Sequence, residues 1–425
     1  MKKNFLAIAT IVVAGALTLT SCKKEKGCMD TSILVTNYNP DAEEDDGSCI
    51  YRYKLQAGEQ LVTSNITSNT TWTADKVWIL PNRISVEEGA TLTIEAGTVI
   101  KGVPGTAANA SALLIAQGAK IMAEGTSSAP IIFTSTDDEI TSGEIASPNL
   151  EVTEFGKWGG LIVLGKAPIS ADNSPAQIEG IPASDENGLY GGSDAADNSG
   201  VIKYVSVRHG GANIGEGNEI NGITFGGVGS GTKVENIEVV GNQDDGIEFF
   251  GGSVNVTNVI VMNVGDDAID GDQAYSGTIT NVAVICGDET DHAFEIDGAE
   301  GSSVGTMTVE GGVVVGSAAA ELGQFRDSAM INLNNITFLG FTSQADGRGD
   351  LSFDGSGSEL NFAENRTTFT GLEYYFTTET WTLTDIFKGG IPATEATDLS
   401  GVATGAAAFG ATWSWAGATL ASKIQ

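Results

Sequence analysis

The chain is poor in basic residues and in histidine. It has 21 Lys and Arg against 55 Asp and Glu, which gives a formal net charge of −34, and it has only 2 His. A surface of this charge repels nucleic acid and anionic membranes, so neither is expected as a direct partner. It also repels acidic polysaccharides unless a divalent cation bridges them. With so few histidines, the sequence does not identify a Ser-His-Asp catalytic triad.

Cysteine and helical periodicity are also scarce. There are 4 Cys and no Cys-x-x-Cys spacing, which argues against a metal site built from thiolates. Cys28 and Cys49 bracket a short acidic segment and could pair in an oxidising compartment. Cys286 lies in an apolar run and is expected in the core. Few windows show a 3.6-residue period, so a mainly helical protein is not expected.

The chain contains one long apolar run, at its start. Lys2 and Lys3 precede an apolar stretch from Phe5 to Leu19, and Leu-Thr-Ser-Cys follows, ending at Cys22. This pattern predicts a signal peptide over residues 1–21. Its ending resembles the lipobox of bacterial lipoproteins, which implies lipidation of Cys22, a tether over 22–27 and an outer-membrane lipoprotein on the periplasmic or cell-surface face. A single-pass anchor and ordinary cleavage nearby are the alternatives.

What the chain does contain is a repeat. Short β-branched stretches begin at Asn236, Asn258 and Asn281, at a spacing of 22 or 23 residues, and each is followed by an acidic, glycine-flanked turn and a second apolar segment. A period of this length, built from short strands and Gly, Asp and Asn turns, predicts the coils of a parallel β-solenoid. The three asparagines are expected to form a ladder of side-chain amides with a structural role.

The rest of the chain is divided by composition. We predict a small acidic module bracketed by cysteines over 28–51, a parallel β-helix over 52–365 and a C-terminal cap over 366–425, because a solenoid end exposes apolar core and strand edges. An amphipathic adhesion tail is the alternative for the last segment. Polar insertions at 135–156 and 170–199 are expected to shape a binding wall on one face.

The repeat also aligns acidic residues. In this register Asp245, Asp267 and His292 stack on successive coils, and a second ladder follows them: Glu248, Asp270, Glu295. Two carboxylates about 5 Å apart repel by roughly 3 kcal/mol at an effective dielectric near 20. Such a column needs a cation, a shared proton or full solvation, which leaves three interpretations: a calcium site, a catalytic dyad or a solvated acidic face. The predicted calcium ligands in the solenoid are Asp244, Asp245, Asp267 and Asp270. In the front module they are Asp45 and Asp46, with a solvated acidic spacer as the alternative.

Part of this pattern resembles the polygalacturonase-like glycoside hydrolases, which are right-handed parallel β-helices. Gln-Asp-Asp-Gly ending at Gly246, Gly-Asp-Asp ending at Asp267 and Asp-His-Ala around His292 follow the order of that family's motifs, with Arg326 near the last. The resemblance implies that Asp245 and Asp266 activate water, that Asp267 is the general acid and that His292 belongs to the site. The family's asparagine is displaced here, His292 lacks its second glycine, and no lysine follows Arg326.

A second resemblance covers most of residues 84–300. Trp-Gly-Gly-Leu-Ile-Val-Leu-Gly-Lys-Ala-Pro-Ile from Trp158, and Asp-Asp-Gly-Ile-Glu-Phe-Phe-Gly-Gly from Asp244, are similar to phrases of an exported β-helix family of the Bacteroidota. Residues 27–49 likewise resemble a small module of exported proteins of that phylum. These resemblances imply a right-handed, pectate-lyase-like, all-β solenoid that is exported or lipid-anchored, and they leave its activity open.

Three functions remain in consideration. The first is a lipid-anchored, calcium-stabilised scaffold of the cell envelope that binds a polysaccharide or cell-surface glycan. The second is an inverting polysaccharide hydrolase of polygalacturonase type, using Asp245, Asp266, Asp267 and His292. The third is a purely structural envelope protein.

Overall fold

The computed structural model describes residues 24–106, 109–213, 220–344, 347–377 and 380–425. It divides the chain into two compact units, Met1–Arg52 and Tyr53–Gln425. The predicted signal peptide and the predicted lipidation site Cys22 lie outside the described residues. None of the helices in the described part of the chain has the length and apolar character that crossing a membrane requires.

The first unit is a small module closed by one disulfide. Cys28 and Cys49 are joined, as the sequence suggested, and Cys28 is buried. Strands β1 (Lys26–Gly27) and β2 (Glu44–Asp45) pair in parallel. A unit of so few residues cannot bury a large core, so the disulfide provides much of its stability.

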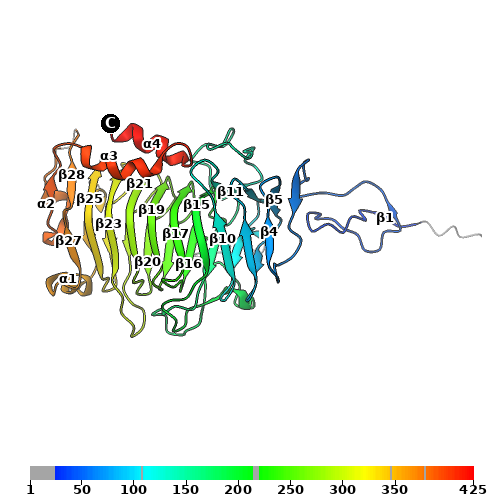
Figure 1. The fold of residues 1–425 in the computed structure, drawn as a ribbon, viewed down its shortest axis with the longest axis horizontal. Coiled ribbons are helices and arrows are strands. Elements are labelled where there is room, and N and C mark those ends of the chain that lie inside the picture. Colours follow the sequence, from blue (N-terminus) through cyan, green and yellow to red (C-terminus); the bar gives the residue numbers. More distant parts are fainter. Residues whose placement is uncertain (1–23, 107–108, 214–219, 345–346, 378–379) are drawn as a thin grey trace, which may run out of the picture. The chain divides into compact units, whose positions relative to one another are not determined.

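The second unit is a parallel β-helix, in which each coil lies on the one before it (Figure 1). The predicted all-β, right-handed parallel β-helix is confirmed. Two sheets run along it, and we call them sheet I and sheet II. Sheet I has nine strands: β6 (Ile84–Val86), β9 (Leu113–Ile115), β12 (Leu161–Leu164), β16 (Ile223–Gly226), β18 (Ile247–Phe250), β20 (Ile269–Asp272), β22 (Phe294–Ile296), β24 (Gly323–Phe325) and β26 (Leu351–Phe353).

Sheet II has sixteen strands, and from β15 onward most of them are long. They are β3 (Glu59–Leu61), β4 (Thr70–Trp72), β5 (Val77–Leu80), β7 (Thr91–Ile94), β8 (Val99–Gly102), β10 (Lys120–Glu124), β11 (Ile131–Ser135), β15 (Gly200–Arg208), β17 (Lys233–Val240), β19 (Asn255–Met262), β21 (Thr278–Ile285), β23 (Met307–Val315), β25 (Ile331–Leu339), β27 (Thr368–Thr370), β28 (Glu373–Tyr375) and β29 (Thr394–Glu395).

Each long strand of sheet II bends at a single residue with left-handed backbone. Asparagine tolerates this conformation better than most residues, and it occupies the bend at Asn236, Asn258 and Asn281, where φ is 56°, 59° and 61°. The Asn258 Nδ2 donates to Asn236 Oδ1 at 2.9 Å, and Asn281 Nδ2 donates to Asn258 Oδ1 at 2.7 Å. The predicted asparagine ladder is therefore present, and it fixes the register of three coils.

The interior between the sheets is apolar. Inward side chains of one coil pack on the same positions of the next, because paired residues such as Val205, Ile237 and Val259 are parallel neighbours. Phe225 stacks on Phe249 with ring centroids 5.4 Å apart. This stacking leaves the outward positions of sheet I free to carry polar side chains.

The predicted cap, 366–425, takes two different places. Strands β27 to β29, with α2 (Leu383–Ile386) and η4 (Lys388–Gly390), continue the last coils, and α1 (Ser356–Ala363) lies just before them. The segment from 399 to the C-terminus, with α3 (Ser400–Ala406), η5 (Ala407–Phe409) and α4 (Trp415–Lys423), instead lies along the outer side of sheet II (Figure 1). We call this segment the tail.

The tail packs on an apolar strip formed by the second halves of the long strands. The strip and the tail share one cluster, separate from the interior core: Val240, Ile260, Met262, Ala283, Ile285, Val313, Val315 and Leu339 from sheet II, with Phe409, Trp413, Ala416, Leu420 and Ile424 from the tail. The position of the tail follows from this strip, since outward apolar side chains need a cover.

Candidate functional site

The candidate site is the outward face of sheet I from β16 to β26. Strand pairing places one outward position of each strand in a single column: Thr224, Glu248, Asp270, Glu295, Gln324 and Ser352. The predicted second ladder, Glu248, Asp270 and Glu295, is part of this column. We call it the strand column.

A second column, the turn column, lies just before the strands. The Asp267 N–H donates to Asp245 Oδ1 at 2.9 Å, and the His292 N–H donates to Asp267 Oδ1 at 2.8 Å. A parallel bridge continues the column from His292 to Glu321. The structure thus stacks Asp245, Asp267 and His292 one above another, and all three are buried.

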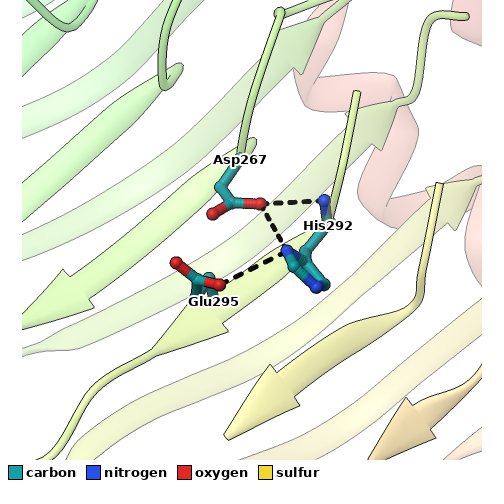
Figure 2. Close-up of side chains that lie close together, drawn as sticks. All are labelled: Asp267, His292 and Glu295. Atoms are coloured by element: carbon teal, nitrogen blue, oxygen red, sulfur yellow. Dashed lines mark hydrogen bonds and ion pairs between the residues drawn. The ribbon is translucent and has the colours of Figure 1, made fainter. Parts of the chain in front are cut away.

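His292 is the centre of a charged group, and Figure 2 shows two of its carboxylates, Asp267 and Glu295, facing the same ring nitrogen. Its Nδ1 lies 2.7 Å from Asp267 Oδ1 and 3.5 Å from Glu295 Oε1, and its Nε2 lies 3.6 Å from Glu321 Oε2. Burial alone would lower the pKa of His292, but the hydrogen bonds to Asp267 and Glu321 raise it to about 10. With both ring nitrogens facing carboxylates, His292 acts as an internal cation.

Arg326 is a second internal cation on this face. The Nη2 atom of Arg326 lies 2.6 Å from Glu295 Oε2, and its Nε donates to Asp297 Oδ1 at 2.8 Å. Burial and the Asp267 carboxylate raise the pKa of Glu295 to about 8, against the opposing effect of Arg326. The coils that carry His292 and Arg326 therefore balance much of their own negative charge.

The neighbouring coils toward the N-terminus lack that balance. Asp245, Glu248 and Asp270 each offer an oxygen within 4.8 Å of the other two. Burial raises the pKa of all three well above the ordinary range, and the charges that act most strongly on them are other carboxylates. The amide of Asn221 joins this group, because its Nδ2 donates to Glu248 Oε2.

Asp244 and Asp266 lie at the edge of the turn column. Asp244, Asp245 and Asp266 form another group whose nearest oxygens lie within 4.8 Å of one another. Asp266 as a whole residue is exposed, but its carboxyl is partly surrounded by protein, and this partial burial, together with the Asp267 charge, raises its pKa to about 6. All the predicted catalytic residues and the predicted solenoid metal ligands are thus on one face, over three successive coils.

One end of this face is walled by an insertion. The segment from 165 to 199, with β13 (Ala176–Gln177), η2 (Glu186–Gly188) and β14 (Leu189–Tyr190), packs its apolar side chains on the outward face of β9 and β12. The Tyr190 hydroxyl donates to Gln273 Oε1 at 2.9 Å, where the covered part ends. Sheet I is therefore apolar and covered at its start, whereas its strand column carries polar side chains from Glu248 onward, of which Glu248 and Glu295 are buried.

Asp45 and Asp46 of the first unit are placed differently. The Asp45 Oδ1 accepts the Gly47 N–H at 3.1 Å, and the Asp46 Oδ1 accepts the Ser48 N–H at 3.0 Å. These short-range bonds shape a turn. Among the described residues of this unit, no group of three metal-ligating side chains converges.

Sequence reasoning missed Asn221, Glu321 and Asp350, the last a buried residue just before β26 whose pKa is raised by burial and by the Glu321 charge. Glu321 follows His292 by 29 residues, because the loop between β22 and β23 lengthens that coil, so a search at 22 or 23 residues passes it. The Glu-Leu-Gly-Gln phrase from Glu321 keeps the polar first and last positions of the earlier turns but exchanges the small and apolar residues between them. Two polar residues three positions apart, rather than the spacing of the coils, were therefore the usable signal.

The comparisons with known proteins agree with the fold. A family model described as a pectate-lyase-like beta helix domain matches residues 64–417, which is most of the chain. Comparison with curated proteins and with solved structures gave no significant match. The family match therefore assigns the architecture and names no ligand.

Proposed function

Because the chain belongs to the family of pectate-lyase-like β-helix domains, we propose that it is an envelope scaffold that binds a polysaccharide or cell-surface glycan along the outward face of sheet I. In this proposal calcium stabilises the face and lipid on Cys22 holds the protein at the outer membrane. The observation that carries the proposal is the contrast within sheet I, whose first strands are covered by the 165–199 segment while its later strands present polar side chains.

The chemistry of the face suits a hydroxyl-rich ligand. Carboxylate, amide and hydroxyl oxygens stand at regular intervals, for example at Glu295, Gln324 and Ser352, and they accept hydrogen bonds from sugar hydroxyls. Consecutive coils lie about 4.8 Å apart, so an extended chain laid along the helix axis meets a similar set of groups on each coil. The wall at one end gives such a ligand a fixed boundary.

The face is poorly suited to free anions. The cations along it are engaged. Arg326 pairs with Glu295 and Asp297, His292 lies between Asp267 and Glu321, and Arg348 pairs with Asp291. An acidic sugar would add negative charge close to carboxylates whose pKa values are already raised, first by burial and then by their neighbours' charges. We therefore propose a neutral glycan, or an acidic one only when a divalent cation bridges it.

Binding of the purified mature protein to immobilised neutral and acidic glycans tests this proposal. We expect saturable binding that Gln324→Ala weakens, while Glu310→Gln on sheet II, whose partner Asn335 would still find an oxygen acceptor, leaves it unchanged. Binding that is insensitive to every substitution on sheet I would rule out this face.

A hydrolase is the second candidate, and one observation favours it. Asp266 is exposed beside the buried Asp267 and His292, and its pKa of about 6 suits proton transfer near neutral pH. An inverting enzyme needs two carboxyl groups about 6.5–9.5 Å apart. Release of reducing sugar that Asp266→Asn and Asp267→Asn both abolish would establish this activity.

The membrane anchor has its own test. Metabolic labelling with a fatty-acid analogue should mark the wild-type protein and spare Cys22→Ala. Labelling of both forms would contradict the anchor and leave the glycan proposal untouched.

A further inference from the structure

The acidic face holds three groups of side chains that could ligate a metal, and they differ in how their charge is balanced. The group of Asp267, His292 and Glu295 contains its own cation, with Arg326 close by. The group of Asp244, Asp245 and Asp266 includes an exposed carboxylate that water can solvate. The group of Asp245, Glu248 and Asp270 has no cation of its own, and two of its three carboxylates are buried.

This third group is enclosed. Asp245 is 6% exposed and Glu248 is 7% exposed, while Asp270 is partly buried with its Oδ1 atom enclosed. An uncompensated charge is expensive to remove from water, and three at this separation are more so. The fold keeps them together because strand pairing fixes Glu248 beside Asp270.

Two enclosed oxygens in this group point to a bound positive species. Asn221 is 1% exposed and its amide lies against Glu248, yet its Oδ1 accepts no hydrogen bond from any residue that the structure describes. The same holds for Asp270 Oδ1. Buried acceptors of this kind are normally satisfied, and both lie at the cluster where negative charge is concentrated.

We propose that Asn221, Asp245, Glu248 and Asp270 form a site for one structural divalent cation that ties three successive coils of the β-helix together. The donor set is entirely oxygen, with three carboxylates and one amide carbonyl, which is the chemistry of a hard cation such as calcium. The ligands come from the turn before β16, from the turn and first residues of β18, and from β20.

The site is a stabilising one, and it is distinct from glycan contact. Asn221 Oδ1 and Asp270 Oδ1 are enclosed, and Asp245 and Glu248 are buried residues, so an ion held there does not reach a sugar on the surface. This inference rests on the calcium part of the proposed function and assigns its ligands. Asp244 and Asp267, which the sequence also suggested as ligands, are outside the site; Asp267 is engaged with His292.

Calcium titration of the metal-free mature protein tests the assignment, by calorimetry and by thermal unfolding. We expect about one ion per chain and a melting temperature that rises by several degrees with calcium. Glu248→Gln and Asp270→Asn should weaken calcium binding at least tenfold and remove the rise. In chelator, both variants should melt at or above the wild-type temperature, because each removes a repelling charge. Glu310→Gln is the matched control and should behave as wild type.

Each outcome decides a separate point. No saturable calcium heat and no change in melting temperature would overturn the site and favour shared protons among the three carboxylates. Calcium binding that persists in both variants would place the ion elsewhere, which also overturns the assignment. Glycan binding by Glu248→Gln in chelator would leave the proposed function standing without this ion, whereas calcium binding without any glycan binding would defeat only the glycan function.

Discussion

At the residue scale, equivalent positions of successive coils balance the surrounding negative charge in different ways. The turn column runs from Asp245 through Asp267 to His292, so one of its members is a base that becomes a cation when its neighbours are acidic. Two carboxylates at this spacing repel, while an imidazolium between them attracts both. A single change of residue type therefore decides whether a coil supplies its own positive charge.

This arrangement predicts that acid stabilises the β-helix. The pKa of Glu295 is raised to about 8 and that of Asp350 to about 6, in both cases chiefly by burial, above unfolded values near 4. The folded state then binds more protons than the unfolded state between about pH 4 and pH 8, so stability falls as the pH rises through that window. His292, with a pKa of about 10, acts in the same direction above its unfolded value near 6.5.

Thermal unfolding in chelator should therefore give a melting temperature several degrees higher at pH 5 than at pH 8. The difference should shrink in Glu295→Gln, which cannot titrate. A melting temperature that rises from pH 5 to pH 8 would contradict the charge distribution described for this face.

Asn258 offers a second test at the same scale. It makes two ladder hydrogen bonds, and its φ is 59°. Asn258→Ala should lower the free energy of unfolding by about 2–3 kcal/mol, since it loses both bonds and places a less tolerant residue in the left-handed region. Asn258→Gly should cost less, because glycine adopts that φ freely. Equal losses in urea titrations of the two variants would show that the backbone conformation contributes nothing.

At the element scale, the tail is held by a buried polar contact as well as by its apolar cluster. The Glu238 Oε1 accepts hydrogen bonds from the Ser414 hydroxyl at 2.6 Å and from the Ala416 N–H at 2.8 Å, at the start of α4. Its other oxygen lies 3.4 Å from Arg208 Nη2, and both side chains are fully buried. One carboxylate on β17 thus joins an ion pair to the N-terminus of a helix.

Removing that carboxylate should undo both contacts. We expect Glu238→Ala to lower the free energy of unfolding by about 3–5 kcal/mol, because Arg208 would remain buried without its partner. Glu235→Gln on the same strand is the control, and its partly exposed pairs with Lys203 and Lys233 should contribute less than about 1 kcal/mol. Denaturant titration distinguishes the two, and equal small losses would show that the buried pair is not needed.

The elements also show what the sequence could predict. The coils from β17 to β22 keep nearly the same length, with equivalent residues 22, 23 or 25 positions apart, so their strands, their asparagine ladder and the stacking of Asp245, Asp267 and His292 could all be predicted. The position of Glu321 could not be predicted in this way, because a longer loop changes the spacing of its coil. The apolar strip under the tail could not be predicted from the sequence either. β-branched residues occur on both faces of these strands, and only the packing shows that the outward ones are covered.

At the scale of the whole molecule, the two units differ in what stabilises them. The first depends on the Cys28–Cys49 disulfide, whereas the second rests on a continuous apolar interior. A disulfide that closes a loop of 21 residues contributes roughly 3 kcal/mol in the chain-entropy model. The free Cys286 is buried, and burial raises the pKa of its thiol to about 12, so a mild reductant or alkylating agent should not affect the second unit.

Reduction of the disulfide should therefore destabilise the first unit and leave the stability of the second unchanged. In dithiothreitol we expect residues 24–52 to become sensitive to protease, while the melting temperature of the β-helix stays within about one degree of its oxidised value, since the disulfide lies wholly outside that core. Cys28→Ser with Cys49→Ser should reproduce the effect without a reductant. A large shift in the main transition would show that the units unfold together.

The position of the tail also has a consequence for how the protein is made. The strip that it covers belongs to strands β17 to β25, which leave the ribosome before residues 399–425 do. Until residues 399–425 have been made and have packed, during synthesis and during any passage across a membrane, the apolar strip of sheet II stays exposed to solvent. Residues 399–425 therefore complete the packing of sheet II, and a nascent chain interrupted before them should bind chaperones through the exposed strip.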